Sequence, residues 1–533
     1  MSGNEELHAR RSTLATWRAS LRAAERERLD ASWALALDAT DEARARYKET
    51  LEAVDDWYAD ADRYEKLTSW KRAPLDETVM DREVRVLASS AEPRQIDGAL
   101  LRKISSAQAD LSHLFATHRG EIDGAPTSNA EIEKILTQSD DVALREKAWR
   151  AFRDVGREAR APLIELVELR NEAARSIGYR DHYAMALAQQ ELDEDELFGL
   201  LQRLERATRA PFRTRKAVHD VERAERFGIS TEELRPWHYQ NVFFQRVYPK
   251  TTIDLDEVYA GVDFTDVAAR FFDGLGLNVR GVLEKSDLYP REGKNQHAFC
   301  TDLDREGDTR ILCNIVPGAR WMTTLLHELG HAAYNRYIAR SLPWSLRGPA
   351  SIAATEAIAM LMGRQSSNVE FLIEYTDLPA MEVTPLSGEL RRMQAFQMQA
   401  FVRWALVMVH FERALYADPR RDDLDAHWFE LVERFQLVPP VPEHEGPDWA
   451  AKIHFAIAPA YYHNYVLGEV MASQLHAHIA EASRQPALTD SLFAGEHLIR
   501  HFFEPGRTYP ADELIERCTG APLSTAAFVR EFT

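Results

Sequence analysis

The chain has 533 residues, which is too long for one simple hydrophobic core, so two or more subdomains are expected. Hydrophobic residues make up 45% and charged residues 28%, which are the proportions of a soluble globular protein. The net charge of −20 argues against a nucleic-acid partner, because phosphate binding needs a basic face.

Residues 1–30, MSGNEELHARRSTLATWRASLRAAERERLD, carry charges throughout and contain no apolar stretch. This pattern excludes a secretory signal and an N-terminal membrane anchor, and no later segment approaches 18 uncharged apolar residues. Three cysteines in the whole chain also fit a reducing compartment. We therefore expect a cytoplasmic protein with no membrane partner.

Helical periodicity dominates the sequence. Apolar positions recur at three- and four-residue spacing over residues 42–67, 97–118, 141–179 and 193–227. The third of these stretches should break near Pro162 and end at Gly178, where a left-handed cap is favourable.

Strand signal is scarce. Its best candidate is QHAFCTDLDREGDTRILCNIV, residues 296–316, in which two alternating runs flank an acidic turn that contains a glycine. The predicted fold class is therefore mainly α, with one small antiparallel sheet directly before the motif described next.

The run LHELGHAAY, residues 326–334, places two histidines and a glutamate in an otherwise apolar helix. His327 and His331 are four residues apart and share one helix face, where neutral imidazoles can take two corners of a zinc tetrahedron. Glu328 points to the adjacent side, from which it can reach a water molecule that the metal activates. This is the H-E-x-x-H pattern of metallopeptidases. The alternative is a chance match on a surface helix whose histidines are solvated.

A third metal ligand is expected from the next helical run, PASIAATEAIAMLMGR, residues 349–364. Glu356 is its only acid and lies 25 residues after His331. A lone buried carboxylate is unfavourable, and metal ligation would remove that cost; pairing with a basic residue is the alternative. The predicted cofactor is one Zn²⁺ per chain, held by His327, His331 and Glu356.

These motifs resemble the angiotensin-converting enzyme (peptidyl-dipeptidase A) family of zinc metallopeptidases. Residues 327–359 are similar to that family's H-E-M-G-H helix, its L-P-x-S-L-R-x-G connection and its H-E-A-I-G helix, and the likeness extends to residues 168–187 and 506–532. The thimet-oligopeptidase and oligoendopeptidase families share the zinc geometry, and their glutamate spacing matches the 25 residues slightly better.

The resemblance implies a two-lobed helical ellipsoid with a deep central cleft and zinc at its floor. Residues 1–120 would form an N-terminal helical lid region. Residues 121–533 would form a helical catalytic region, with the zinc site at 327–356 and a substrate and oxyanion segment at 452–465.

The resemblance also implies catalytic roles. Glu328 would act as general base, His454 would hold the substrate backbone, and Tyr465 would donate its phenol to the tetrahedral oxyanion. Tyr461 is a rival for Tyr465, because the tyrosine pair lies one residue further from His454 than in the family pattern. The alternative is an aromatic helix face that packs in the core.

Substrate-binding residues follow from the same resemblance. Lys452, Tyr462 and Gln240 would anchor a free carboxylate. His297 and Ala298 match an edge strand to which an extended peptide adds.

Several positions depart from the family pattern. Met360 replaces an acid and Thr355 replaces a histidine near the third ligand, so other residues must orient the zinc histidines. Asn464 stands where the family has its chloride-binding arginine, which puts chloride activation in doubt. Gln296 replaces a disulfide cysteine, in agreement with a cytoplasmic enzyme.

The predicted function is a zinc peptidase that removes dipeptides from the free C-termini of short peptides. One alternative is an oligopeptidase that cleaves internally. An alternative of another class is a catalytically silent peptide-binding protein, against which the intact set of His327, Glu328, His331 and Glu356 argues. The sequence leaves the oligomeric state open.

Overall fold

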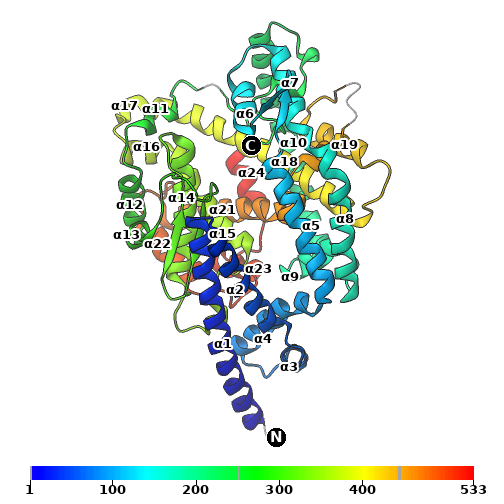
Figure 1. The fold of residues 1–533 in the computed structure, drawn as a ribbon. Helices are drawn as coiled ribbons and strands as arrows, with labels where there is room; N and C mark the ends of the chain where they lie inside the picture. Colours follow the sequence, from blue (N-terminus) through cyan, green and yellow to red (C-terminus); the bar gives the residue numbers. More distant parts are fainter. Residues whose placement is uncertain (1–2, 250, 442–445) are drawn as a thin grey trace. The chain divides into compact units, whose positions relative to one another are not determined.

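The computed structural model describes residues 3–249, 251–441 and 446–533 (Figure 1). Its chain divides into two compact units of interleaved segments. Unit 1 contains Met1–Gln95, Thr252–Leu390 and Leu467–Ala527, and unit 2 contains Ile96–Thr251, Arg391–Val466 and Phe528–Thr533. The predicted lid region, residues 1–120, coincides with neither unit, and its role stays a prediction, as does the cleft.

Unit 1 consists almost entirely of helices. They are α1 (Gly3–Leu37), α2 (Asp41–Ala59), α3 (Ala61–Arg72), α4 (Thr78–Ala91), α11 (Leu255–Ala260), α12 (Phe264–Gly274), α13 (Arg280–Lys285), α14 (Ala319–Tyr337), α15 (Ile352–Gly363), α16 (Val369–Tyr375), α17 (Ala380–Val383), α22 (Leu492–Leu498) and α23 (Ala511–Thr519). The boundaries between the units fall near or within α18 (Ser387–Ala417), α21 (Tyr462–Ser483) and α24 (Ala526–Phe532).

The N-terminal helices of unit 1 pack on one another through apolar residues at helical spacing. Helix α1 lies alongside α2, and α3 lies alongside α4 (Figure 1). Leu14, Trp57, Leu67 and Val84 are buried in their shared core. The helix predicted over residues 42–67 is two helices, because the side chain of Asp60 accepts the backbone N–H of Arg63 and caps α3.

The predicted sheet is confirmed in unit 1. Strands β3 (Phe299–Asp302) and β4 (Thr309–Leu312) pair antiparallel with Phe299 opposite Leu312. Carboxylates in the acidic turn accept backbone N–H groups, for example Asp302 from Arg305 at 2.9 Å. Among the described residues β3 pairs only with β4, so its other edge is open.

Unit 2 is also helical. Its helices are α5 (Gly98–Thr117), α6 (Asn129–Gln138), α7 (Val142–Arg153), α8 (Val155–Ser176), α9 (His182–Gln189), α10 (Glu194–Phe227), α19 (Leu424–Gln436), α20 (His454–Ile457) and most of α18. Phe212, Tyr239, Phe244, Phe396 and Val438 belong to one buried cluster of this unit.

A second small sheet in unit 2 was not predicted. Strands β1 (Gly120–Ile122) and β2 (Ala125–Thr127) form a tight antiparallel hairpin. Asp123 and Gly124 both have positive φ, 53° and 79°, as a two-residue hairpin turn requires. The Asp-Gly dipeptide was the available signal, but strands of three residues are too short to show alternation.

The predicted helix break near Pro162 was wrong. The chain breaks at Asp154 instead, and Pro162 lies inside α8. An internal proline costs about 3 kcal/mol, but burial of Leu163, Leu166 and Val167 contributes about 1.5–3 kcal/mol each. The predicted end is confirmed, because α8 stops at Ser176 and Gly178 has φ 96°.

Two further features concern the apolar helices and the cysteines. In the described ranges, we find no helix with both the length and the apolar character needed to cross a bilayer. Cys300, Cys313 and Cys518 are all free thiols.

Candidate metal centre and substrate segment

Helix α14 carries three of the predicted site residues. It begins after Gly318, where the backbone N–H of Ala319 donates to Asp256 Oδ1 at 2.8 Å. Its apolar residues are buried in unit 1, and they include Met322, Leu325, Leu326 and Leu329. His327 and His331 lie one turn apart, with ring centroids separated by 4.8 Å.

Helix α15 packs against α14 and brings the third predicted residue, Glu356. The approach depends on Gly330, because a Cβ there would lie only 2.8 Å from the Cα of Ala359. A second glycine, Gly468 of α21, lies so close to Glu356 that a Cβ there would be 2.9 Å from the Cβ of Glu356. Small residues on both sides therefore set the position of this carboxylate.

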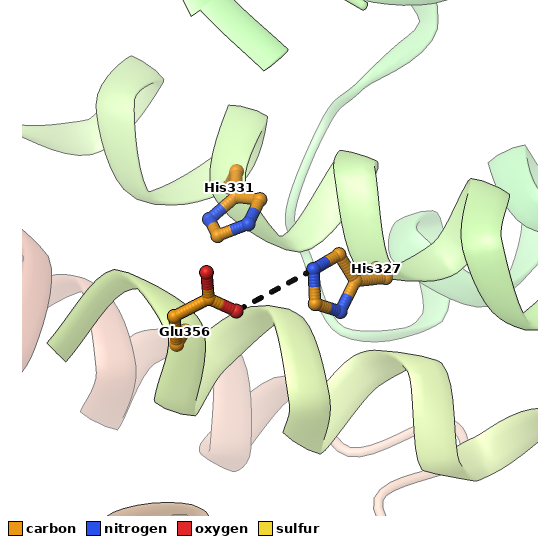
Figure 2. Close-up of side chains that lie close together, drawn as sticks. All are labelled: His327, His331 and Glu356. Carbon is orange, nitrogen blue, oxygen red and sulfur yellow. Dashed lines mark ion pairs between the residues drawn. The ribbon is translucent and has the colours of Figure 1, made fainter. Parts of the chain in front are cut away.

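The three side chains point toward one another from α14 and α15 (Figure 2). Each of His327, His331 and Glu356 offers one ligand atom, and these atoms lie within 4.8 Å of one another. We call these three residues the metal group. The Nε2 atom of His327 is 3.6 Å from Oε2 of Glu356, as the dashed line in Figure 2 marks. Two imidazole nitrogens and one carboxylate oxygen form a donor set that zinc takes in catalytic sites with an open position.

Burial affects the protonation of both histidines. It lowers the pKa of His327 to about 4. It also lowers the pKa of His331, and the charge of His327 acts in the same direction. Both imidazoles are therefore neutral near pH 7, which is the form that binds a metal. The donor set and its protonation state both fit a zinc ion.

Sequence reasoning missed the partner of His331. The Nδ1 atom of His331 lies 2.7 Å from Oγ1 of Thr355, the residue directly before Glu356. When Nε2 of such a histidine holds a metal, Nδ1 carries the hydrogen and donates it to the hydroxyl oxygen. The sequence showed only that Thr355 stands where the resembling family has a histidine. It did not show that this side chain contacts His331.

Glu328 lies on α14 beside the three-residue group but does not belong to it. Its side chain is buried, which raises its pKa to about 8, and the negative charge of Glu356 contributes to the shift. A carboxyl group in this position can hold and transfer a proton next to a bound metal.

His297 and Ala298 lie directly before β3. His297 is exposed, and its backbone N–H donates to Asn295 Oδ1 at 2.9 Å. These residues thus lead into β3, and their contact with an extended substrate stays a prediction.

The second predicted group lies in unit 2, on α20 and at the start of α21. The His454 and Tyr462 rings are 5.0 Å apart, and Tyr465 lies 5.6 Å from Tyr462 and 5.1 Å from Tyr461. Tyr462 is buried, and its hydroxyl oxygen accepts from Trp404 Nε1 at 3.1 Å. Tyr461 and Tyr465 are both half-buried, so they stay alternatives for the oxyanion donor.

Lys452 is buried, with 8% of its surface exposed. Its Nζ donates to Gln245 Oε1 at 2.9 Å and lies 5.0 and 4.9 Å from the ring centroids of Phe243 and Trp404. Burial lowers the pKa of Lys452 to about 7. In the described part of the chain no carboxylate forms an ion pair with it. Gln245 thus contacts Lys452 directly, and no motif in the sequence had pointed to it. The role of Gln240 as a contact of the substrate carboxylate stays a prediction.

Two buried side chains of unit 2 support the segment between His454 and Tyr461. Arg170 donates to the backbone oxygens of Phe455 at 2.8 Å and Ala456 at 2.5 Å. Glu412 Oε1 accepts from the backbone N–H of Ala460 at 2.8 Å. Arg170 lies in the stretch 168–187 that carries the family resemblance, but the sequence did not show its partners, and no motif pointed to Glu412.

Comparison with known proteins gives two family matches. The sequence model of peptidase family M3 matches residues 135–533, and the angiotensin-converting enzyme model matches residues 4–209. The angiotensin-converting enzyme-like protein Ace3 of Mus musculus is 23% identical, over 76% of this chain and 59% of its own length.

The angiotensin-converting enzymes of Sus scrofa and Bos taurus are each 25% identical. Their matches cover 72% and 94% of this chain but only 32% and 38% of their own lengths. The chain therefore spans less than two thirds of each of these relatives.

Proposed function

The chain belongs to peptidase family M3, and from that premise we propose that it is a zinc peptidase that removes dipeptides from the free C-termini of short peptides. His327, His331 and Glu356 would hold the ion, and their donor set and the neutral state of the histidines support this assignment. Zinc bound there would polarise the scissile carbonyl and make a water molecule more acidic.

Glu328 is proposed to take the proton of the attacking water and to pass it to the leaving amine. Its support is its position on α14, directly after His327 and outside the metal group. A bound cation there would favour the ionised carboxylate that a base needs, against the effect of burial. His454 is proposed to hold the substrate backbone, and Tyr465 to donate its phenol to the oxyanion. The resemblance of residues 452–465 to the family pattern supports both roles.

The observation that supports the removal of dipeptides is the burial of Lys452 without an ion-pair partner among the described residues. A carboxylate loses hydration on burial, so its anchor needs a cation and neutral donors. Lys452 is buried without an ion-pair partner in the described ranges, and Gln245 accepts its hydrogen bond through Oε1. The amide N–H groups of Gln245 can therefore donate to a bound carboxylate, with Tyr462 as the third proposed contact.

The test compares a short peptide that ends in a free carboxylate with the same peptide amidated at its C-terminus. Lys452→Gln should weaken the use of the acid by about 2–3 kcal/mol, the magnitude for a lost charge-assisted contact, and should leave the amide nearly unaffected. Mass spectrometry should find dipeptides as products of the acid. Equal losses on both peptides would contradict the carboxylate anchor.

The second candidate is an oligopeptidase that cleaves internally. It is favoured by the family M3 match over residues 135–533 and by the 25-residue spacing between His331 and Glu356. The open edge of β3 after His297 and Ala298 would suit either candidate, because strand addition uses main-chain hydrogen bonds. Internal fragments formed equally from both peptides would establish this second function.

A further inference from the structure

Unit 2 contains a cavity of about 250 Å³ with four arginines in its wall. Arg209 and Arg213 come from α10, Arg403 from α18 and Arg434 from α19. Among the residues that the structure describes, no acidic side chain lines this cavity. Such a cluster is unexpected in a chain with a net charge of −20.

The positive charges of this arginine cavity are balanced only in part. Both oxygens of Glu205 accept from Arg209 at 2.8 Å, and Oε1 also accepts from Arg403 at 3.3 Å. One carboxylate thus faces two guanidinium groups. Arg213 and Arg434 are exposed at the cavity and form no ion pair within the described ranges.

Arg403 adds an unsatisfied donor at this place. Its side chain is 1% exposed, and its Nη2 donates to the backbone oxygen of Glu205 and to Thr208 Oγ1. Its Nε is also buried but finds no acceptor in the described part of the chain. A buried donor without an acceptor is unfavourable. An anion at the arginines would reduce the repulsion between the guanidinium groups, and this gain does not depend on whether it reaches the buried Nε.

We propose that the arginine cavity binds a small oxyanion of the phosphate type, as free phosphate or as a phosphate monoester. Two N–H groups of one guanidinium can donate to two oxygens of the same oxyanion. Arginines therefore favour such an oxyanion over an anion that consists of a single atom. Phe212 and Phe435 supply an apolar part of the wall that suits the organic group of an ester. The site is independent of the peptidase function proposed above.

The neighbouring cavity, of about 380 Å³, provides a contrast. It shares Arg434 and Phe435 with the arginine cavity, but Asp195 and Glu205 also line it. These carboxylates disfavour an anion, so the oxyanion is assigned to the smaller cavity.

The test is calorimetric titration of the full chain with inorganic phosphate and, separately, with phenyl phosphate. We expect saturable binding at one site, and each of Arg213→Gln and Arg434→Gln should weaken it about tenfold through loss of a charge-assisted contact. Arg206→Gln is the matched control, because Arg206 is exposed on the same helix α10 but does not line the cavity. Tighter binding of phenyl phosphate would identify an ester as the ligand, and tighter binding of phosphate would identify the free anion.

Both cavity variants replace exposed side chains, so the fold should persist. The proposal is overturned if neither anion binds saturably. It is also overturned if both cavity variants bind as the unchanged chain does, because the anion then occupies another place such as the metal centre. If Arg206→Gln weakens binding equally, the loss of any nearby positive charge is enough to explain the effect, and the proposal is also overturned.

Discussion

The orientation of His331 depends on one contact, the 2.7 Å hydrogen bond between its Nδ1 and Thr355 Oγ1. Thr355→Val keeps the shape of the side chain and removes the hydroxyl. Zinc affinity should fall about 10–100-fold, because the partner of a ligand histidine fixes its ring and tautomer. Competition with a coloured chelator measures this affinity. Thr355→Ser is the control and should keep it; unchanged affinity in the valine variant would show that Thr355 does not orient the ring.

Glu328 differs from its neighbours because it lies beside the metal group without belonging to it. Glu328→Gln should keep full zinc occupancy and lower kcat by about 10²–10⁴, the usual contribution of a general base. Zinc content by elemental analysis and kcat on one peptide check the two halves of this prediction. High kcat at full occupancy would assign the proton transfer to another residue.

Lys452 makes the proposed carboxylate anchor sensitive to pH. Burial lowers its pKa to about 7, so the ammonium form is present below that pH and is lost as the pH rises through it. The kcat/KM for a peptide with a free C-terminus should therefore fall above about pH 7, since this ratio reports the free enzyme. The C-terminally amidated peptide is the control and should lack this decline. Parallel profiles for the two peptides would contradict a role for the Lys452 charge.

At the scale of helices, the metal centre depends on the close packing of α14 and α15. Gly330→Ala would bring a Cβ to 2.8 Å from the backbone of Ala359, which can move only with its helix. The free energy of unfolding, measured in urea, should fall by about 1–3 kcal/mol, the cost of overpacking. Zinc affinity should fall with it, because Glu356 moves relative to His327 and His331.

The control for that change is Gly199→Ala in α10. The nearest atom to a Cβ there is Arg203 Nη1 at 3.4 Å, an ordinary contact with a flexible side chain. Alanine favours a helix interior over glycine by up to about 1 kcal/mol, so this variant should be slightly more stable. A Gly330→Ala chain as stable as the control would show that the two helices can separate freely.

At the scale of the whole molecule, the metal group lies within unit 1 alone. A ligand that binds only the folded state stabilises it, by about 2.7 kcal/mol at a concentration one hundred times its Kd. Adding zinc to the metal-free chain should therefore slow amide hydrogen exchange in α14 and α15, and much less in α8 and α10 of unit 2. No change in α14 would contradict metal binding, and an equal change in all four helices would show that the units unfold together.

Local periodicity predicted the stretch that contains α2 and α3 in unit 1, and it predicted α5, α8 and α10 in unit 2. The stretches 97–118 and 193–227 became α5 and α10 with ends within a residue of the prediction. Helix capping and side-chain burial explain the two places where the predicted helix boundaries were wrong. Asp60 starts a new helix inside residues 42–67, and buried leucines carry α8 through Pro162. The sequence alone does not show whether a proline or a capping acid ends a helix or whether burial of the next turn keeps it intact. The balance depends on what that turn packs against.

The sequence by itself was enough to predict that His327, His331 and Glu356 form one group. The i, i+4 spacing in a helix places the two histidines on one face, and a lone acid in an apolar helix needs a partner. Only the tertiary structure decided which residues support that chemistry. Thr355 reaches His331 from a second helix, and Gln245 lies 207 residues before Lys452 in the chain. These contacts have no periodic signal, since they depend on how far helices slide and turn against each other. That register follows from close packing at residues such as Gly330, which only the folded molecule reveals.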